Sequence, residues 1–96
     1  MRLPNLTIPA AGVASNAIEL PSLDKVTLFA PAALTAVVTI QLSGDDGVTW
    51  HNAPTIAINA MVTINPALAS MLRVLSAGAE AADRIFFVHG GGPNSV

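Results

Sequence analysis

Turn-forming residues divide this chain into short segments, and their spacing limits the possible fold more than any other feature of the sequence. Seven prolines and seven glycines are spread over 96 residues. Between them lie runs rich in valine, isoleucine, threonine and leucine, which favour extended backbone. These runs are 17–20, 25–29, 34–42, 48–51, 55–58, 61–64, 71–75 and 84–89. Seven to eight short strands predict an all-β fold, a small antiparallel β-sandwich or a barrel.

Two details of this arrangement follow from local signals. Runs 25–29 and 34–42 are expected to pair across the turn at Pro31–Ala33. Asn65-Pro66 is typical of a helix N-terminus, so a helix over residues 66–75 is an alternative. The alternation of side chains along 71–75 favours a short turn over 66–69 followed by a strand.

The ends of the chain differ from its centre. Residues 1–16 contain prolines and small residues and are expected to form an extended N-terminal arm, whereas residues 17–89 form the sandwich. Residues 90–96 are rich in glycine and are expected to be a flexible tail. Segments of this kind can lie across a neighbouring subunit and gain strand-like hydrogen bonds when they bind.

The composition points to a surface that is covered by other protein. Charged residues make up 10 % of the chain and hydrophobic residues 52 %, while a globular chain has about 25 % charged residues. The net charge is −2 and the four cationic residues are scattered, so neither nucleic acid nor a membrane is an expected direct partner. The absence of cysteine fits assembly in a reducing cytoplasm. We therefore expect a homo-oligomer or a docked subunit.

One motif is specific. Residues 43–50, SGDDGVTW, resemble the Asp-box hairpin, written S-x-D-x-G-x-T-W, at all five defined positions. Asp45 is expected to accept hydrogen bonds from turn amides, Gly47 to take a positive φ, and Trp50 to return to the core. The resemblance implies a structural hairpin joining 34–42 to 48–51, formed by Ser43, Asp45, Gly47, Thr49 and Trp50. A sialidase propeller needs several four-stranded blades, so that activity is not expected of this chain.

The remaining polar residues form no recognisable catalytic or metal-binding pattern. Asp45 and Asp46 lack the further ligands of a calcium loop, and His51 and His89 lack zinc spacing. The other acidic residues are expected to be solvated carboxylates near turns: Glu19, Asp24, Glu80 and Asp83. We therefore expect no catalytic residue, no cofactor and no metal, and a protein that is not an enzyme.

The large aromatic residues are few: Phe29, Trp50, Phe86 and Phe87. At least three of them are expected to pack in the core. Phe86 and Phe87 are neighbours on one predicted strand, so their side chains must point to opposite faces of the sheet. One of the pair should meet a partner or a second layer.

The segments VTLFAPAALTAVVTIQLSGDDGVTW and SMLRVLSAGAEAADRIFFVHG resemble small virion proteins of tailed bacteriophages, over roughly residues 19–90. The resemblance implies that the β-sandwich is jelly-roll-like. It also implies a capsid decoration or cement protein, assembled in the host cytoplasm, that binds the major capsid protein or another virion protein. Related decoration subunits are often trimers. The alternative is a carbohydrate-binding or adhesion module of a tail fibre or a secreted protein.

Overall fold

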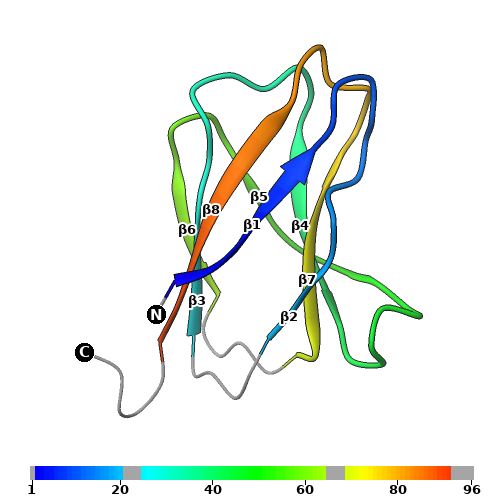
Figure 1. Cartoon of the computed structure of the whole chain (residues 1–96), viewed down its shortest axis with the longest axis vertical. Helices are drawn as coiled ribbons and strands as arrows, with labels where there is room; N and C mark the ends of the chain where they lie inside the picture. Colours follow the sequence, from blue (N-terminus) through cyan, green and yellow to red (C-terminus); the bar gives the residue numbers. More distant parts are fainter. Residues whose placement is uncertain (1, 21–24, 65–68, 92–96) are drawn as a thin grey trace.

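The computed structural model describes residues 2–20, 25–64 and 69–91, and this part of the chain is entirely β (Figure 1). It contains eight strands in two antiparallel sheets of four. The strands are β1 (Arg2–Ile8), β2 (Ile18–Glu19), β3 (Lys25–Phe29), β4 (Val38–Ser43), β5 (His51–Ile56), β6 (Met61–Ile64), β7 (Met71–Ser76) and β8 (Arg84–Gly91). In the described residues, no helix has the length and apolar character needed to cross a membrane.

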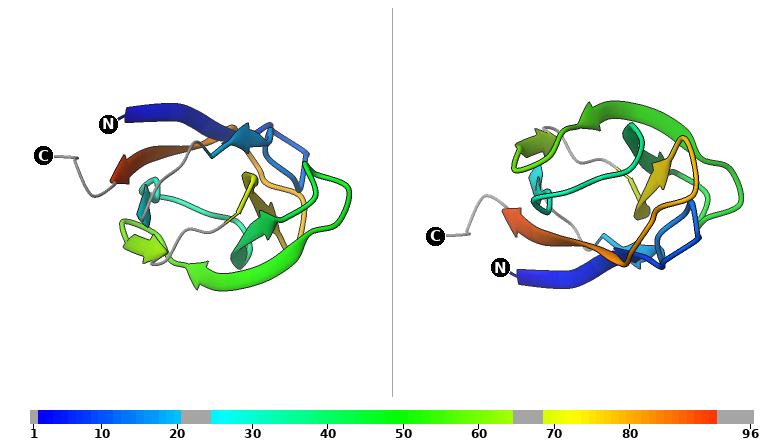
Figure 2. Two further views of the ribbon diagram at one scale, coloured as in Figure 1. Left: turned by 90° about the horizontal axis from the view of Figure 1, so that it is seen from below. Right: turned by 90° about the horizontal axis from the view of Figure 1, so that it is seen from above.

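The strand order is that of a jelly roll. Sheet A has the order β1-β8-β3-β6 and sheet B the order β2-β7-β4-β5. The first strand therefore pairs with the eighth, the second with the seventh, the third with the sixth and the fourth with the fifth. The two sheets form opposite layers when the molecule is seen end-on (Figure 2). This arrangement confirms the predicted antiparallel, jelly-roll-like sandwich.

Alternating apolar side chains fill the space between the two sheets. Along β7, Leu72 and Val74 are buried while Met71 and Arg73 are partly exposed, as a strand with one covered face requires. The fully buried Phe86 of β8 is the largest residue of this core. Burial of each Val, Leu, Ile or Phe side chain contributes roughly 1.5–3 kcal/mol to folding.

The predicted pairing of 25–29 with 34–42 is wrong. β3 belongs to sheet A and β4 to sheet B, so the segment between them crosses from one layer to the other. Residues 34–37 are not part of the strand, because the backbone N–H groups of Thr35 and Ala36 donate to the carboxylate of Glu80 at 2.8 and 3.2 Å. The Glu80 side chain, from the β7–β8 connection, thus accepts the hydrogen bonds that a neighbouring strand would otherwise accept.

The N-terminal segment is a strand of the sandwich, which corrects the prediction of an extended arm over residues 1–16. β1 pairs with β8, and Leu6 and Ile8 are fully buried. Pro4 lies in a bulge, because two residues of β1 stand opposite Phe87 alone. Proline is tolerated at such a position on an edge strand, which explains how a proline-containing segment joins the sheet.

Other boundaries shift for similar reasons. β5 begins at the last residue of the predicted run 48–51 and ends within the predicted run 55–58, and Pro54 lies at a bulge on the edge of sheet B. Residues 48–50 belong to the turn before β5, so the strand predicted over them is wrong. The strand prediction for 71–75 is confirmed by β7, while most of the predicted turn at 66–69 lies outside the described residues. β8 continues through Gly91, so two residues of the predicted tail belong to the sheet, and residues 92–96 lie outside the described part.

Candidate functional site

The outer face of sheet A carries exposed apolar side chains. Phe86 and Phe87 point to opposite faces of β8, as predicted: Phe86 is fully buried, and Phe87 is 45 % exposed. Phe87 is paired with Phe29 on β3, and Phe29 is paired with Met61 on β6, which is 63 % exposed. We call Met61, Phe29 and Phe87 the apolar row. It crosses three adjacent strands, and Ile85 extends it along β8.

A hollow of about 350 Å³ lies at one end of the apolar row. The guanidinium carbon of Arg2 is 5.1 Å from the centre of the Phe87 ring, within the range of a cation–π contact. The rings of Phe29 and His89 meet edge to face, with their centres 5.5 Å apart. We call this the aromatic hollow. The described residues that line it, Arg2, Phe29, Phe87 and His89, combine aromatic faces with polar side chains.

The prediction that at least three of the four large aromatic residues pack in the core is wrong. Only Phe86 belongs to the core, and Phe29 and Trp50 are partly exposed like Phe87. The strand register explains Phe29 and Phe87, because each alternates with a buried neighbour and must face outward. The sequence shows that side chains alternate between the two faces of each strand. It does not show which of the two faces the second sheet covers.

The Asp-box-like residues form the hairpin between β4 and β5. The hydroxyl of Ser43 donates to Asp45 Oδ1 at 2.8 Å and accepts from the N–H of Gly47 at 2.9 Å. Asp45 Oδ1 also accepts from the N–H of Thr49 at 2.8 Å, and these hydrogen bonds, that from Thr49 above all, lower the pKa of Asp45. Gly47 has a φ of 92°, a conformation that side chains disfavour. The structure thus brings Ser43, Asp45, Gly47 and Thr49 together in one turn.

Trp50 does not return to the core, which corrects the prediction. Its ring instead lies 4.4 Å from the guanidinium carbon of Arg73 on β7. Arg73 Nε donates to Gln41 Oε1 at 2.8 Å, and Gln41 Nε2 donates to Asn52 Oδ1 at 2.9 Å. These side chains form a polar chain across β7, β4 and β5. The polar chain thus crosses the outer face of sheet B, whereas the apolar row crosses that of sheet A.

Glu80 is the residue whose role the sequence analysis missed. Its side chain is fully buried, although it was expected to be solvated. The carboxylate accepts hydrogen bonds from the N–H groups of Thr35 and Ala36, the hydroxyl of Ser76 at 2.7 Å and Nε of Arg84 at 2.9 Å. Burial raises the pKa of Glu80, but these hydrogen bonds outweigh it and lower the pKa to about 2.

The backbone of Glu80 adds a third connection to the same cluster. Its N–H donates to the carbonyl of Gly12 at 3.0 Å, and its carbonyl accepts from the N–H of Ala11 at 2.7 Å. The β1–β2, β3–β4 and β7–β8 connections lie at one end of the sandwich, at the top of Figure 1. Glu80 joins all three, so its carboxylate is a structural link and not a free acid or base.

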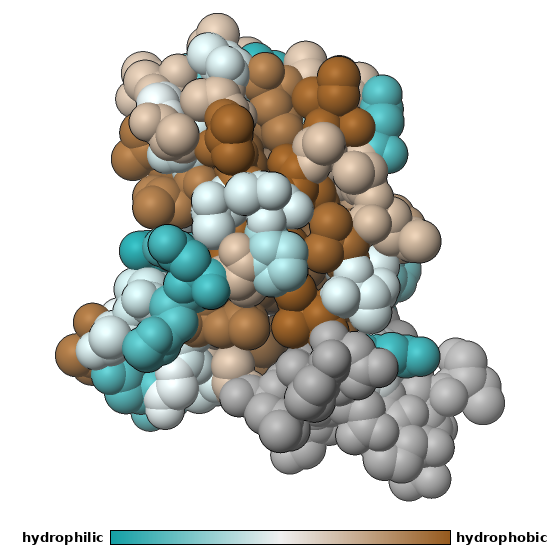
Figure 3. Space-filling model, turned by 180° about the vertical axis from the view of Figure 1, so that it is seen from behind, coloured by the Kyte–Doolittle hydropathy of each residue, from teal (hydrophilic) through white to brown (hydrophobic). Residues whose placement is uncertain are grey.

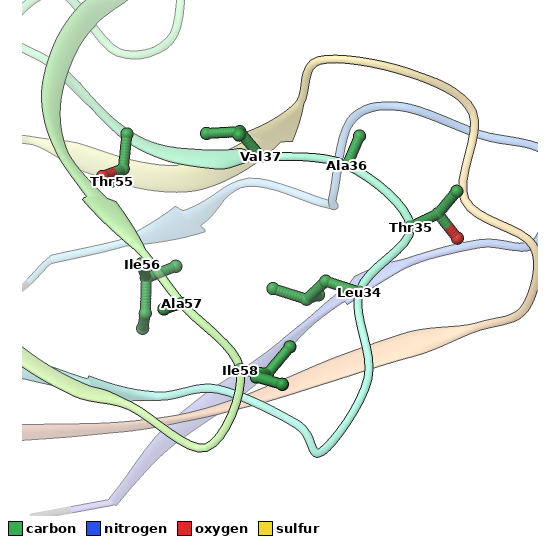
Figure 4. Close-up of a pocket in the computed structure, with 8 residues that line it drawn as sticks. All are labelled: Leu34, Thr35, Ala36, Val37, Thr55, Ile56, Ala57 and Ile58. Carbon is green, nitrogen blue, oxygen red and sulfur yellow. The ribbon is translucent and has the colours of Figure 1, made fainter.

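An uncharged groove lies between the β3–β4 connection and the end of β5 (Figure 4). It has a volume of about 530 Å³ and is lined by residues 34–37 and 55–58. Leu34 and Ile58 project toward each other, while Thr35 points away, where its hydroxyl accepts from the N–H of Ala81 at 3.0 Å. The described residues that line the groove offer mainly apolar contact and carry no charge.

Apolar exposure is not limited to these two places. Figure 3 shows hydrophobic surface from the top to the middle of the face opposite to that of Figure 1. The large hydrophobic residues exposed in the described part are Val13, Val37, Val48, Ile58, Met61, Ile85 and Phe87.

Within the described part of the chain, no three metal-ligating side chains gather at one point. His51 is exposed at the start of β5, on the other sheet from His89.

Comparisons of the chain with protein-family models, with curated proteins and with solved structures found no match. The function must therefore be argued from the surfaces described above.

Proposed function

We propose that this protein is a virion structural protein, a capsid decoration or cement subunit that stabilises a coat lattice through protein–protein contacts. The observation that carries the proposal is the apolar row on sheet A. This row lies on three adjacent, hydrogen-bonded strands and consists of Met61, Phe29 and Phe87. Because the sheet already holds these side chains in place, binding does not require the ordering of a flexible loop and its cost in conformational entropy.

The contrast between the two sheets supports this assignment. The outer face of sheet B is occupied by the polar chain from Asn52 to Trp50, which needs no partner. The apolar row on sheet A leaves two large hydrophobic side chains about half exposed or more. Aromatic and methionine side chains are enriched in the centres of protein interfaces. A partner that covers this face would remove that surface from water.

The fold agrees with the same role by analogy alone, because jelly rolls serve as viral capsid domains and also as lectin domains. In this proposal the partner is the major capsid protein or another virion protein, and the subunit joins the virion after assembly in the host cytoplasm. It would act by thermodynamic linkage. A protein that binds the assembled lattice but not the free coat subunits lowers the free energy of the assembled state and so stabilises it.

Co-sedimentation with coat particles tests the proposal. The wild-type protein should sediment with particles of the virus that encodes it, prepared without this subunit. Phe87→Ser should weaken the affinity at least about tenfold, seen as a lower bound fraction below saturation, because removing an aromatic anchor from an interface costs roughly 2 kcal/mol or more. Val48→Ser is the matched control, since Val48 is 83 % exposed at the β4–β5 hairpin, away from sheet A. Equal binding of both variants would contradict docking through the apolar row.

The second candidate is a carbohydrate-binding or adhesion module, and the aromatic hollow is the observation that favours it. Sugar rings stack on aromatic faces, and Arg2 and His89 add polar groups beside Phe29 and Phe87. Titration calorimetry with a panel of oligosaccharides distinguishes the two functions. Saturable sugar binding that Phe87→Ser abolishes, together with no binding to coat particles, would favour the adhesion module.

A further inference from the structure

Three of the four edge strands in the described sheets are protected against pairing with another chain. β1 and β5 each carry a proline at a bulge, Pro4 and Pro54, and β2 has only two residues. Proline, bulges and short length are the usual means by which proteins block an open sheet edge. β6, Met61–Ile64, has none of these features except modest length: its pairing with β3 is regular, and it contains no charge and no proline.

The direction of the backbone groups of β6 follows from one hydrogen bond. The N–H of Ala30 donates to the carbonyl of Ala60 at 2.9 Å, which makes these two residues a hydrogen-bonded pair. Such pairs alternate along antiparallel strands, so Val62 and Ile64 bond to β3. The N–H and C=O groups of Met61 and Thr63 then point to the open edge. The Thr27 and Thr63 hydroxyls, 2.9 Å apart, agree with the close side chains of a non-hydrogen-bonded pair.

We infer that β6 is a self-pairing edge, at which a second copy of this chain adds its own β6 in antiparallel orientation. A twofold axis at Val62 places Met61 of one copy opposite Thr63 of the other. Both residues direct N–H and C=O groups outward, so this register forms four hydrogen bonds and leaves no outward group of β6 unpaired. The same axis joins the two copies of sheet A into one sheet of eight strands.

The side chains of β6 also suit a second copy as the occupant. β6 is uncharged, so two copies approach without repulsion between their paired strands. The two Met61 side chains become diagonal neighbours on the outer face, where long side chains can reach each other. Met61 is 63 % exposed in the single chain, and pairing covers part of it.

The predicted assembly is a dimer, unlike the trimer that is common among the decoration proteins the chain resembles. Four backbone hydrogen bonds and two methionines form a small interface, so we expect a weak dimer whose population depends on concentration. This inference does not rest on the proposed function, because the pairing is tested on the purified protein alone. On a repeating lattice, a high effective concentration would strengthen the same contact.

Replacement of Thr63 tests the hydrogen bonds. Thr63→Pro removes the outward N–H, and it leaves the backbone ladder to β3 intact because the N–H and C=O of Thr63 do not bond to β3. Thr63→Ala is the matched control, since it loses the same hydroxyl and keeps the N–H. Sedimentation velocity from ~1 µM to ~1 mM should show dimer for the wild type and Thr63→Ala and monomer for Thr63→Pro. Circular dichroism establishes that each variant is folded. A wild type that stays monomeric throughout, or a folded Thr63→Pro that dimerises like Thr63→Ala, would overturn the inference.

A cysteine at the axis tests the register and does not depend on Thr63→Pro folding. The chain has no cysteine, so Val62→Cys introduces a single thiol. Two residues of a non-hydrogen-bonded antiparallel pair have Cα atoms about 4.5 Å apart, a separation that a disulfide can bridge. Mild oxidation should convert Val62→Cys to a covalent dimer much faster than Val48→Cys, whose thiol lies on the β4–β5 hairpin. Equal rates of cross-linking would reject the axis at Val62.

Discussion

The carboxylate of Glu80 accepts a hydrogen bond of 2.8 Å from the backbone N–H of Thr35, a residue 45 positions earlier in the chain. This contact holds the β3–β4 connection against the β7–β8 connection at one end of the jelly roll. It is one of four hydrogen bonds from Thr35, Ala36, Ser76 and Arg84 that converge on one buried carboxylate. The carboxylate of Glu80 is therefore the point at which most side-chain hydrogen bonds between these two connections converge.

Removal of this carboxylate should destabilise the protein strongly. Glu80→Ala removes the buried ion-pair partner of Arg84 and the acceptor of the N–H groups of Thr35 and Ala36, a change that costs about 3–5 kcal/mol. Glu80→Gln keeps the shape but turns an amide group toward donors, and should cost about 1–3 kcal/mol. Urea denaturation measures both, with Glu19→Gln as the control at an exposed carboxylate. A loss in Glu80→Ala no larger than that of the control would contradict the linking role.

The lowered pKa of Glu80 predicts how stability changes with pH. The pKa is about 2 in the folded protein against an ordinary value of 4.5, so the folded state favours the ionised carboxylate. The resulting stabilisation is fully present above about pH 4.5 and is lost as the pH falls toward 2.

Denaturation midpoints measured between about pH 6 and 2 check this prediction. The wild type should lose stability over the acid part of this range, and Glu80→Gln should lose less, since it has no carboxylate to protonate at this position. Asp45, whose pKa is also lowered, contributes in the same direction in both proteins, so the comparison isolates Glu80. Parallel pH profiles for the two proteins would refute the assignment.

The β4–β5 hairpin offers a matched pair of glycines. Gly47 has a φ of 92°, and a β-carbon there would lie 3.3 Å from Met71 Sδ, whereas a β-carbon on Gly44 would meet no atom within 4 Å. Gly47→Val should therefore cost about 1–3 kcal/mol, and Gly44→Val should cost far less. Thermal melts followed by circular dichroism measure the difference. Equal melting temperatures would show that the turn does not depend on the conformation of Gly47.

The sequence predicted the parts of this fold that local chemistry determines. The runs 25–29 and 61–64 match β3 and β6, and the Asp-box-like residues predicted the turn that joins β4 to β5. In each case neighbours in sequence carry the information, through alternation or through hydrogen bonds within a few residues.

Long-range contacts determine what the sequence did not predict. Glu80 stands in a loop that looks solvated, and only the approach of Thr35 and Ala36 from another connection makes it a buried anchor. The pairing of β1 with β8 is equally non-local, and the prolines near the N-terminus hid it. The apolar row on sheet A also depends on which face of each strand the second sheet covers.

The position of β1 in the sheet reverses an expectation about the N-terminal segment. If residues 2–8 were an arm, their substitution would affect only binding. Leu6 is instead fully buried in the core, so Leu6→Ala should cost about 2–5 kcal/mol in the isolated protein. Thr7→Ala is the control on the opposite face of β1. Urea denaturation measures the effect. An unchanged denaturation midpoint for Leu6→Ala would support the original expectation that this segment is an extended arm outside the core.

The salt dependence of binding to coat particles follows from the chemistry of the apolar row. Among the described residues that line the aromatic hollow, Arg2 is the one that carries a charge, and the apolar row of Met61, Phe29 and Phe87 is uncharged. Salt screens contacts between charges but does not weaken the burial of apolar surface.

The bound fraction should therefore stay nearly constant from about 0.05 to about 1 M sodium chloride. Arg2→Gln separates the two contributions: it should change the salt dependence slightly, whereas Phe87→Ser should reduce binding at every salt concentration. Co-sedimentation of the three proteins with particles across this range supplies the measurement. Release of the wild type by high salt would mean that charges outside the apolar row hold the complex, and the docking surface would then have to be sought elsewhere on the sandwich.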